Sequence, residues 1–213
     1  VRSDKLAKKQ EGISFLLVDI AAPGVAVRPI RDIAGHEEFC EVFLDNVRTP
    51  ATNLVGGLNQ GWTVAKSLLG FERIHIGSPK LPEYGLQVLR SVARARGVLE
   101  DPVFREHLAR LQLDVAHLGD IYTRFAAILG RGEPLGPEVS LLKIWATESF
   151  QHIAGLIVET AGDCGGHAGK IQMGGESVEL LAPFYKALPS TIYGGSNEIQ
   201  RNILAKQVLN LPG

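Results

Sequence analysis

The spacing of apolar residues changes at Gly61, and this change constrains the fold more than any other feature of the 213-residue chain. Before Gly61, short apolar runs alternate with turn residues, a pattern typical of strands. The runs span residues 13–18, 25–30 and 39–44. After Gly61, apolar residues recur every three or four positions, which indicates helices. We therefore expect a mainly α fold in which strands occupy residues 1–58 and helices occupy residues 59–213.

Local signals divide the second part into helices. The helix that begins at Gly61 should kink or break at Pro79 and Pro82, because proline lacks a backbone donor and clashes with the preceding turn. Asp101 followed by Pro102 predicts a strong helix start. Glycines make the stretch 162–175 a predicted irregular segment. The expected helices after the prolines span residues 83–96, 102–129, 138–160, 176–183 and 196–209.

Composition excludes several classes of function. The formal net charge of −1 provides no bulk field for nucleic acid or an anionic membrane. Apolar runs are too short to span a bilayer, and the polar start shows no signal peptide. Cys40 and Cys164 form no disulfide or zinc pattern, and the six histidines show no metal-ligand spacing. We expect a protein of a reducing compartment, the cytoplasm, with no resident metal and no nucleic-acid or membrane partner.

Three strands cannot cover both faces of a sheet, because a sheet needs a second layer. Either these strands pack on the helices of the same chain or their remaining partners are absent from it. The residues alone leave both possibilities open.

One motif points to a family. The stretch Tyr193-Gly194-Gly195-Ser196-Asn197-Glu198 resembles the signature of acyl-CoA dehydrogenases, flavoenzymes that desaturate acyl-CoA thioesters. The resemblance runs from Gly12 to Leu211. Within the family, the chain is most similar to the large-subunit type of pimeloyl-CoA dehydrogenase. It implies a C-terminal four-helix bundle preceded by part of a middle β-domain. It also implies FAD, an acyl-CoA substrate, an electron-transfer flavoprotein partner and a homo- or hetero-oligomer. The chain then matches a C-terminal fragment, itself expected to be inactive.

The catalytic base is the main question that the motif raises. In the commonest family pattern a glutamate follows the tyrosine, but here Gly194 occupies that position. The sequence Phe71-Glu72-Arg73 resembles the branch that carries its glutamate on an earlier helix. The resemblance therefore implies Glu72 as the base, with Phe71, Arg73, Tyr193 and Gly194 at the substrate. A carboxylate in an apolar pocket gains basicity, which suits proton abstraction. Each of these residues also has a purely structural explanation. Glu72 fits a solvated helix glutamate, Arg73 fits a surface arginine, and Gly194 fits a glycine that a positive φ requires.

Cofactor residues are implied less completely. The resemblance assigns flavin contacts to Ser196 and Glu198, although Ser196 also reads as a simple helix N-cap. Phe104 matches a family phenylalanine that reaches flavin. Asp101 stands where family members often carry arginine, and Glu159 replaces a glutamine of the flavin loop. These acidic residues disfavour the usual flavin contact between subunits.

Two other functions stay open at the level of sequence. The chain fits a non-catalytic partner subunit of a hetero-oligomeric dehydrogenase, in which Glu72 is incidental. It also fits a flavin-dependent oxidase on the same scaffold. A flavin bound near Glu72, with loss of activity when Glu72 is changed, would distinguish an active dehydrogenase from the partner subunit. Oxygen consumption without an electron-transfer partner would identify the oxidase.

Overall fold

The computed structural model describes residues 1–5 and 8–212, and the side chains of residues 69, 70, 71 and 73 lie outside the described part. Its contacts divide the chain into two units, Val1–Phe71 and Glu72–Gly213. Helix α1 (Gly61–Ile76) begins in the first unit and ends in the second. The predicted domain boundary after residue 58 stays a prediction. In the described residues, every helix is too short or too polar to cross a membrane.

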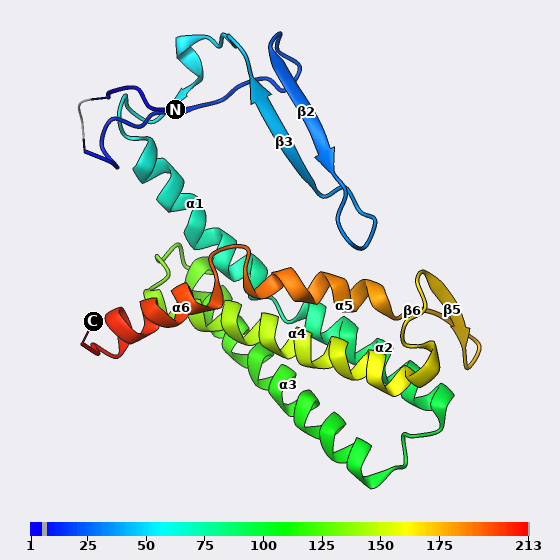
Figure 1. Cartoon of the computed structure of the whole chain (residues 1–213). Helices are drawn as coiled ribbons and strands as arrows, with labels where there is room; N and C mark the ends of the chain where they lie inside the picture. Colours follow the sequence, from blue (N-terminus) through cyan, green and yellow to red (C-terminus); the bar gives the residue numbers. More distant parts are fainter. Residues whose placement is uncertain (6–7, 213) are drawn as a thin grey trace. The chain divides into compact units, whose positions relative to one another are not determined.

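The first unit contains two small antiparallel sheets (Figure 1). Strand β1 (Phe15–Leu16) pairs with β4 (Leu54–Val55), so the predicted strand at 13–18 is shorter than expected. Strands β2 (Val25–Ile30) and β3 (Phe39–Leu44) form a hairpin with the predicted bounds.

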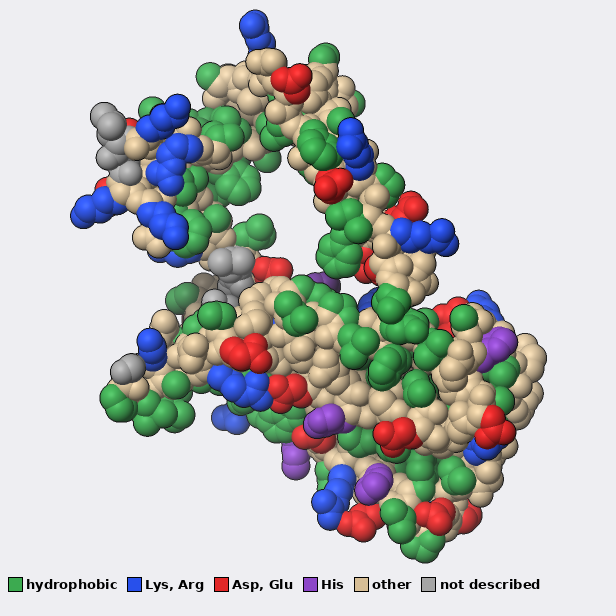
Figure 2. Space-filling model, in the orientation of Figure 1, with side chains coloured by type: hydrophobic (Ala, Val, Ile, Leu, Met, Phe, Trp, Pro, Cys, Tyr) green, Lys and Arg blue, Asp and Glu red, His purple; other side chains and the backbone are tan. Residues whose placement is uncertain are grey.

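Apolar side chains on this hairpin are exposed, as the green surface of the strands in Figure 2 shows. Phe39 is 51% exposed, Val42 53% and Leu44 60%. A β-sheet normally buries its apolar face against another layer. The hairpin therefore has the surface of a sheet whose second layer is not provided within this unit.

The second unit is a helical bundle, which confirms the predicted mainly α fold. Helices α2 (Lys80–Arg96), α3 (Pro102–Gly130) and α4 (Ser140–Ala161) pack side by side, and successive helices run in opposite directions (Figure 1). Short helices α5 (Leu181–Ala187) and α6 (Asn197–Ile203) also contact α4, and a π-helical turn (Leu204–Val208) follows α6. Buried side chains between α2, α3 and α4 form the main core, including Leu89, Val92, Ile153 and Ile157.

Three predicted elements differ from the structure. The predicted break of the helix is present, since α1 ends at Ile76 and α2 begins at Lys80 after Pro79, but Pro82 lies within α2. Pro82 is in the first turn, where no intrahelical donor is needed. Residues 176–183 were predicted to be helical, but β6 (Glu176–Glu179) pairs with β5 (Lys170–Met173) and α5 begins only at Leu181. The segment 162–175 therefore contains a strand. The positive φ of Gly174 and Gly175 forms the tight turn of this hairpin, which the helical reading overlooked.

The predicted start of α3 is confirmed in detail. The Asp101 carboxylate accepts hydrogen bonds from the backbone N–H groups of Val103 (3.0 Å) and Phe104 (2.9 Å). Pro102 occupies the first helical position, where its missing donor costs nothing. Phe104, in the first turn, is 8% exposed and packs into the main core. The cap thus fixes both the helix start and a core side chain.

We predict that Asp101→Ala lowers the free energy of unfolding of the chain by about 0.5–2 kcal/mol, because two N–H groups lose their acceptor. The measurement is urea denaturation followed by far-ultraviolet circular dichroism. Glu100→Ala is the matched control, since it removes a neighbouring, exposed carboxylate that only pairs with Arg105 at 3.6 Å. Equal effects of both substitutions would contradict the capping role.

Candidate functional site

The structure brings together the two positions that compete for the role of base. Glu72 is half-buried in the last turn of α1, and Gly194 lies in the turn that leads into α6. A Cβ atom built on Gly194 would lie 3.7 Å from the Glu72 Oε1. The carboxylate of Glu72 is thus at the place into which a side chain at position 194 would project. The two positions are 122 residues apart in the sequence, yet side chains at both would project to the same point.

Gly194 also has a backbone reason to be glycine. Its φ is +63°, a conformation that residues with a Cβ adopt only with strain. The same Cβ would collide with the Ile76 Cδ1 atom, one turn after Glu72. Gln200 reaches back to this turn and donates to the carbonyl oxygens of Gly194 (3.4 Å) and Gly195 (3.5 Å). The turn is therefore held from the helix that follows it.

A buried polar network ties the start of α6 to α4. Lys143 has no exposed surface, and its Nζ donates to the Asn197 Oδ1 at 2.7 Å. The Asn197 amide donates to the Glu148 Oε1 (3.0 Å) and to the Thr147 hydroxyl (3.1 Å). Arg201 then binds the Glu148 carboxylate at 2.7 Å. Burial lowers the pKa of Lys143, and the charges of Glu198 and Glu148 oppose that shift.

The two predicted cofactor residues of this turn have clear local roles. Ser196 is the N-cap of α6 and accepts from the Ile199 N–H at 3.4 Å, so the plain reading of this serine is confirmed. Glu198 is exposed in the first turn of α6. Its pKa is lowered by a hydrogen bond from its own backbone N–H, then by one from Ser196, and by the charges of Arg201 and Lys143. Glu198 thus presents an ionised carboxylate to solvent.

The other residues predicted for the site lie in different parts of the chain, and not all of their side chains are described. Phe71 and Arg73 flank Glu72 in α1, but their side chains lie outside the described part of the chain. Phe104 has a packing role in the core, and its predicted flavin contact stays a prediction. Asp101 caps α3, whereas Glu159 is exposed. Among the described residues, no group of three or more histidine, cysteine, aspartate or glutamate side chains is arranged to hold a metal ion.

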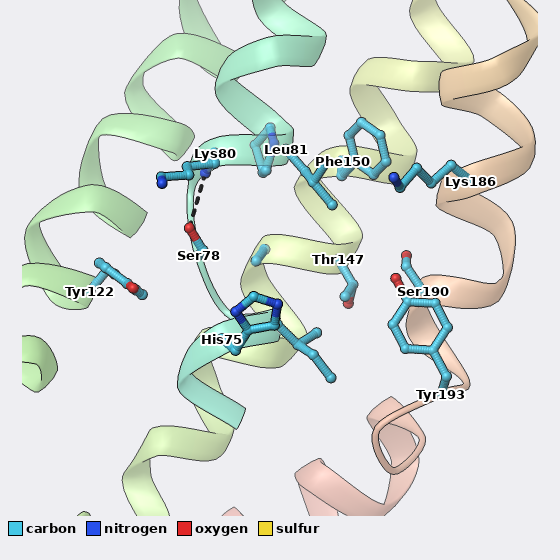
Figure 3. Close-up of a pocket in the computed structure, with 13 residues that line it drawn as sticks. His75, Ser78, Lys80, Leu81, Tyr122, Thr147, Phe150, Lys186, Ser190 and Tyr193 are labelled. Carbon is cyan, nitrogen blue, oxygen red and sulfur yellow. Dashed lines mark hydrogen bonds between the residues drawn. The ribbon is translucent and has the colours of Figure 1, made fainter. Parts of the chain in front are cut away.

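A cavity of about 500 Å³ lies inside the bundle unit (Figure 3). It begins at His75 and Ile76 of α1 and is bordered across the bundle by Tyr193, the residue before Gly194. Thr147 and Phe150 of α4 form one wall, and Lys186 reaches toward Phe150 from α5 (Figure 3). Sequence reasoning missed this cavity because its lining comes from segments that are far apart in the chain.

Sequence reasoning also missed Lys143, although a signal was present. Lys143 interrupts the apolar run Leu141-Leu142-Lys143-Ile144 in a helix that is otherwise buried on most sides. A lysine in such a position is seldom fully buried without a partner. The partner, Asn197, is 54 residues away, and no local pattern identifies it.

Comparison with known proteins decides the family. The family model described as "Acyl-CoA dehydrogenase, C-terminal domain" matches residues 59–209. The chain belongs to the acyl-CoA dehydrogenase family. This confirms the resemblance seen in the signature stretch, and it supports an oxidoreductase.

Individual members place the chain within the family. It is 37% identical to "Acyl-CoA dehydrogenase IpdE1" of Mycolicibacterium smegmatis, covering 99% of this chain and 52% of the relative. It is 28% identical to "Cyclohexane-1-carbonyl-CoA dehydrogenase" of Geobacter metallireducens, covering 94% of this chain and 53% of that protein. The chain thus spans about half the length of these relatives.

Solved structures agree with the fold. A chain of the ChsE4-ChsE5 complex from Mycobacterium tuberculosis matches all of this chain and 56% of its own length, with 26% identity and a TM-score of 0.83. Butyryl-CoA dehydrogenase from Megasphaera elsdenii matches 98% of this chain and 54% of its own, with a TM-score of 0.85. At 19% identity the second similarity supports the fold alone.

We predict that the contribution of Lys143 to stability depends on pH. The pKa of Lys143 is lowered from its ordinary value of 10.5 in the folded protein. The unfolded chain therefore binds the proton of this lysine more tightly than the folded chain does. Stability therefore rises as the pH increases through the folded pKa toward 10.5. Lys143→Met lacks this term, so the stability of the unmodified chain relative to Lys143→Met should increase between neutral pH and pH 10.

Urea denaturation at several pH values measures this difference. Lys170→Met, which removes an exposed lysine on β5, controls for the loss of one positive charge. A difference between the parent and Lys143→Met that stays constant over the whole pH range would refute the prediction.

Proposed function

We propose that the chain is the C-terminal part of an FAD-dependent acyl-CoA dehydrogenase, and that Glu72 is its catalytic base. The observation that carries the proposal is the placement of the Glu72 carboxylate 3.7 Å from the position of a Cβ on Gly194. Gly194, at the commoner base position of the family, has no side chain, and the Glu72 carboxylate lies where a side chain at position 194 would project. Family membership supports the reaction class, because relatives along nearly the whole chain are named as acyl-CoA dehydrogenases.

Glu72 would remove the proton from the carbon next to the thioester carbonyl. A carboxylate held beside that carbon is a competent general base when it is positioned within hydrogen-bond reach. Bound flavin would supply the acceptor for the hydride that leaves the neighbouring carbon. The remaining residues of the site orient the substrate: Tyr193 and Ile76 border the space beside Glu72, and the Gln200 hydrogen bonds hold the turn that carries Gly194.

The residues of this chain fit one portion of FAD. The exposed, ionised Glu198 carboxylate beside the Ser196 cap suits an acceptor for hydroxyl groups, such as those of the ribityl chain. They do not fit the diphosphate, since Asp101 and Glu159 contribute negative charge at the positions where the family uses arginine and glutamine. We propose that the diphosphate contacts come from outside this chain.

An electron-transfer flavoprotein and an oligomer belong to the same proposal. The acidic substitutions favour a hetero-oligomer in which the two kinds of subunit bind flavin differently. The fold similarity to a chain of the ChsE4-ChsE5 complex is in keeping with this assembly. A non-catalytic role in such an assembly is the competing function, and the experiments below separate the two.

We predict that the isolated 213-residue chain binds FAD poorly and self-associates. The hairpin exposes Phe39, Val42 and Leu44, and Asp101 and Glu159 provide no positive charge for the diphosphate. Equilibrium dialysis with FAD and analytical ultracentrifugation measure the two properties. The complete protein, with any partner subunit, is the control. Stoichiometric FAD on a monomeric chain would contradict the prediction.

We predict that Glu72→Gln in the complete enzyme keeps acyl-CoA binding but slows flavin reduction by about 10²–10⁴-fold. The amide has nearly the same shape, yet it cannot accept the proton. The measurement is anaerobic bleaching of flavin absorbance after mixing with acyl-CoA. Reduction at the parent rate would remove Glu72 from the role of base and favour the partner-subunit function.

We predict that Gly194→Glu partly restores activity to Glu72→Gln, because the new side chain projects toward the same point. The rescue should be incomplete, owing to the positive φ and the collision with Ile76 Cδ1. Adding Ile76→Val removes that atom and should improve the rescue. Gly194→Ala in the same background carries the backbone strain without a carboxylate, so any activity it restores would argue against a relocated base.

A further inference from the structure

We infer that Lys143 and Asn197 form a positioning pair for the proposed base: by fixing the first residue of α6 on α4, the pair sets how closely the turn at Gly194 approaches Glu72. The inference rests on the proposed function and adds two residues that act on proton abstraction through the turn. Three observations carry it, namely the full use of the Asn197 amide, the length of the other hydrogen bonds that hold the turn, and the close packing of the turn against α1.

The Asn197 side chain is fully engaged by α4. It is only 2% exposed, and its Oδ1 accepts from the Lys143 Nζ at 2.7 Å. Its Nδ2 donates to the Thr147 hydroxyl (3.1 Å) and to the Glu148 Oε1 (3.0 Å). A primary amide has two N–H donors, so none is left over for a ligand. The amide therefore holds the start of α6 on α4 and does not contact substrate or flavin.

Lys143 selects the orientation of this amide. A lysine Nζ only donates and an ionised carboxylate only accepts, so the Asn197 oxygen must face Lys143 and the nitrogen must face Glu148. Lys143 has no exposed surface, and it takes part in none of the ion pairs among the described residues. Burying an amine without a carboxylate at ion-pair distance costs more free energy than burying an apolar side chain. Packing alone therefore does not explain a lysine at this position.

The other hydrogen bonds that hold the turn are long. The Gln200 Nε2 donates to the carbonyl oxygens of Gly194 at 3.4 Å and Gly195 at 3.5 Å, beyond the usual range for such bonds. The buried Gln200 Oε1 has no hydrogen-bond partner within the described part of the chain. Asn197 follows Gly195 by two residues and makes shorter bonds. The Asn197 amide is therefore the stronger restraint on the position of the turn.

The turn lies directly against the end of α1 that carries the proposed base. A Cβ atom on Gly194 would lie 3.7 Å from the Glu72 Oε1 and would collide with the Ile76 Cδ1. A displacement of about 1 Å near a reacting group can cost about 10²-fold in rate. Loss of the Lys143–Asn197 contact should therefore slow proton removal by Glu72. Thioester affinity should change little, because neither member of the pair contacts the substrate.

Anaerobic flavin reduction after rapid mixing tests the inference in the complete protein, together with any partner subunit. The probes are butanoyl-, octanoyl- and cyclohexanecarbonyl-CoA, and the one that reduces the flavin of the parent fastest is then used for all variants. Lys143→Met and Asn197→Leu should each slow reduction by about 10- to 100-fold, with the Kd of the thioester close to that of the parent. The double variant should be no slower than the slower single variant, because both substitutions remove the same contact.

Ser149→Ala is the matched control. Ser149 is also a buried polar residue of α4, but its hydroxyl donates to Asp114 of α3, so this variant should reduce flavin at the parent rate. A probe deuterated at the carbon next to the thioester carbonyl separates positioning from a general loss of structure. The isotope effect on flavin reduction should rise in Lys143→Met and Asn197→Leu, because proton removal limits the rate more strongly, and it should stay at the parent value in Ser149→Ala.

Hydrogen–deuterium exchange of peptides that cover residues 190–200 provides a readout without turnover. Exchange should be faster than in the parent in both pair variants and unchanged in Ser149→Ala, because local opening of the turn then costs less free energy. Unchanged exchange in either pair variant overturns the inference, as does flavin reduction at the parent rate in either of them. Rate losses that multiply in the double variant overturn it as well.

The same measurements separate this inference from the proposed function. If Glu72→Gln slows flavin reduction but the pair variants react at the parent rate, the dehydrogenase function stands and the positioning pair is refuted. If no probe reduces the flavin of the parent, yet exchange in the turn rises in the pair variants alone, the restraint on the turn stands and the dehydrogenase function is refuted.

Discussion

The burial of helix α4 is the constraint on which the rest of the bundle depends. Most of its surface is covered by α2, α3, α5 and α6, and several of its polar side chains pair with residues of these elements. Trp145 and Ser149 donate to Asp114 of α3, and Lys143 donates to Asn197 of α6. Gln151 donates to the backbone oxygens of Ala187, the last residue of α5, and of Leu188, which follows it. These contacts fix the register of the surrounding helices, and through Asn197 they fix the turn that contains Gly194.

The placement of Glu72 beside Gly194 follows from that register. Without a side chain at position 194, the turn can approach the last turn of α1, and the Glu72 carboxylate occupies the space beside it. A side chain at that position would require Ile76 to move and the backbone to tolerate a positive φ. The glycine thus has two physical roles: it allows the positive φ of the turn, and it leaves room for the Ile76 side chain. Both agree with the proposed transfer of the base to α1, since a second carboxylate there would repel the first.

Local signals predicted the parts of the fold that local chemistry determines. The Asp101–Pro102 start of α3, the Ser196 cap of α6 and the strands at 25–30 and 39–44 follow from nearby residues. The β5–β6 hairpin was missed because its glycine turn resembles a flexible loop in sequence. The pairing of Lys143 with Asn197 and the lining of the cavity depend on contacts between residues far apart in the chain, which no local pattern identifies. Resemblance to the family supplied Glu72, which its helical neighbours alone did not distinguish from a surface glutamate.

The arrangement also separates the proposed chemistry into two parts. The proposed base, Glu72, lies in the bundle unit, where buried hydrogen bonds hold Asn197 and hence the signature turn. The contacts for the phosphates of the cofactor are not provided by Asp101, which is engaged as a helix cap, or by Glu159, which has the wrong charge. Positioning of a base tolerates little displacement, whereas phosphate binding depends on charge from any nearby element. The proposed assembly therefore has the more demanding geometry in the bundle unit and the phosphate contacts elsewhere.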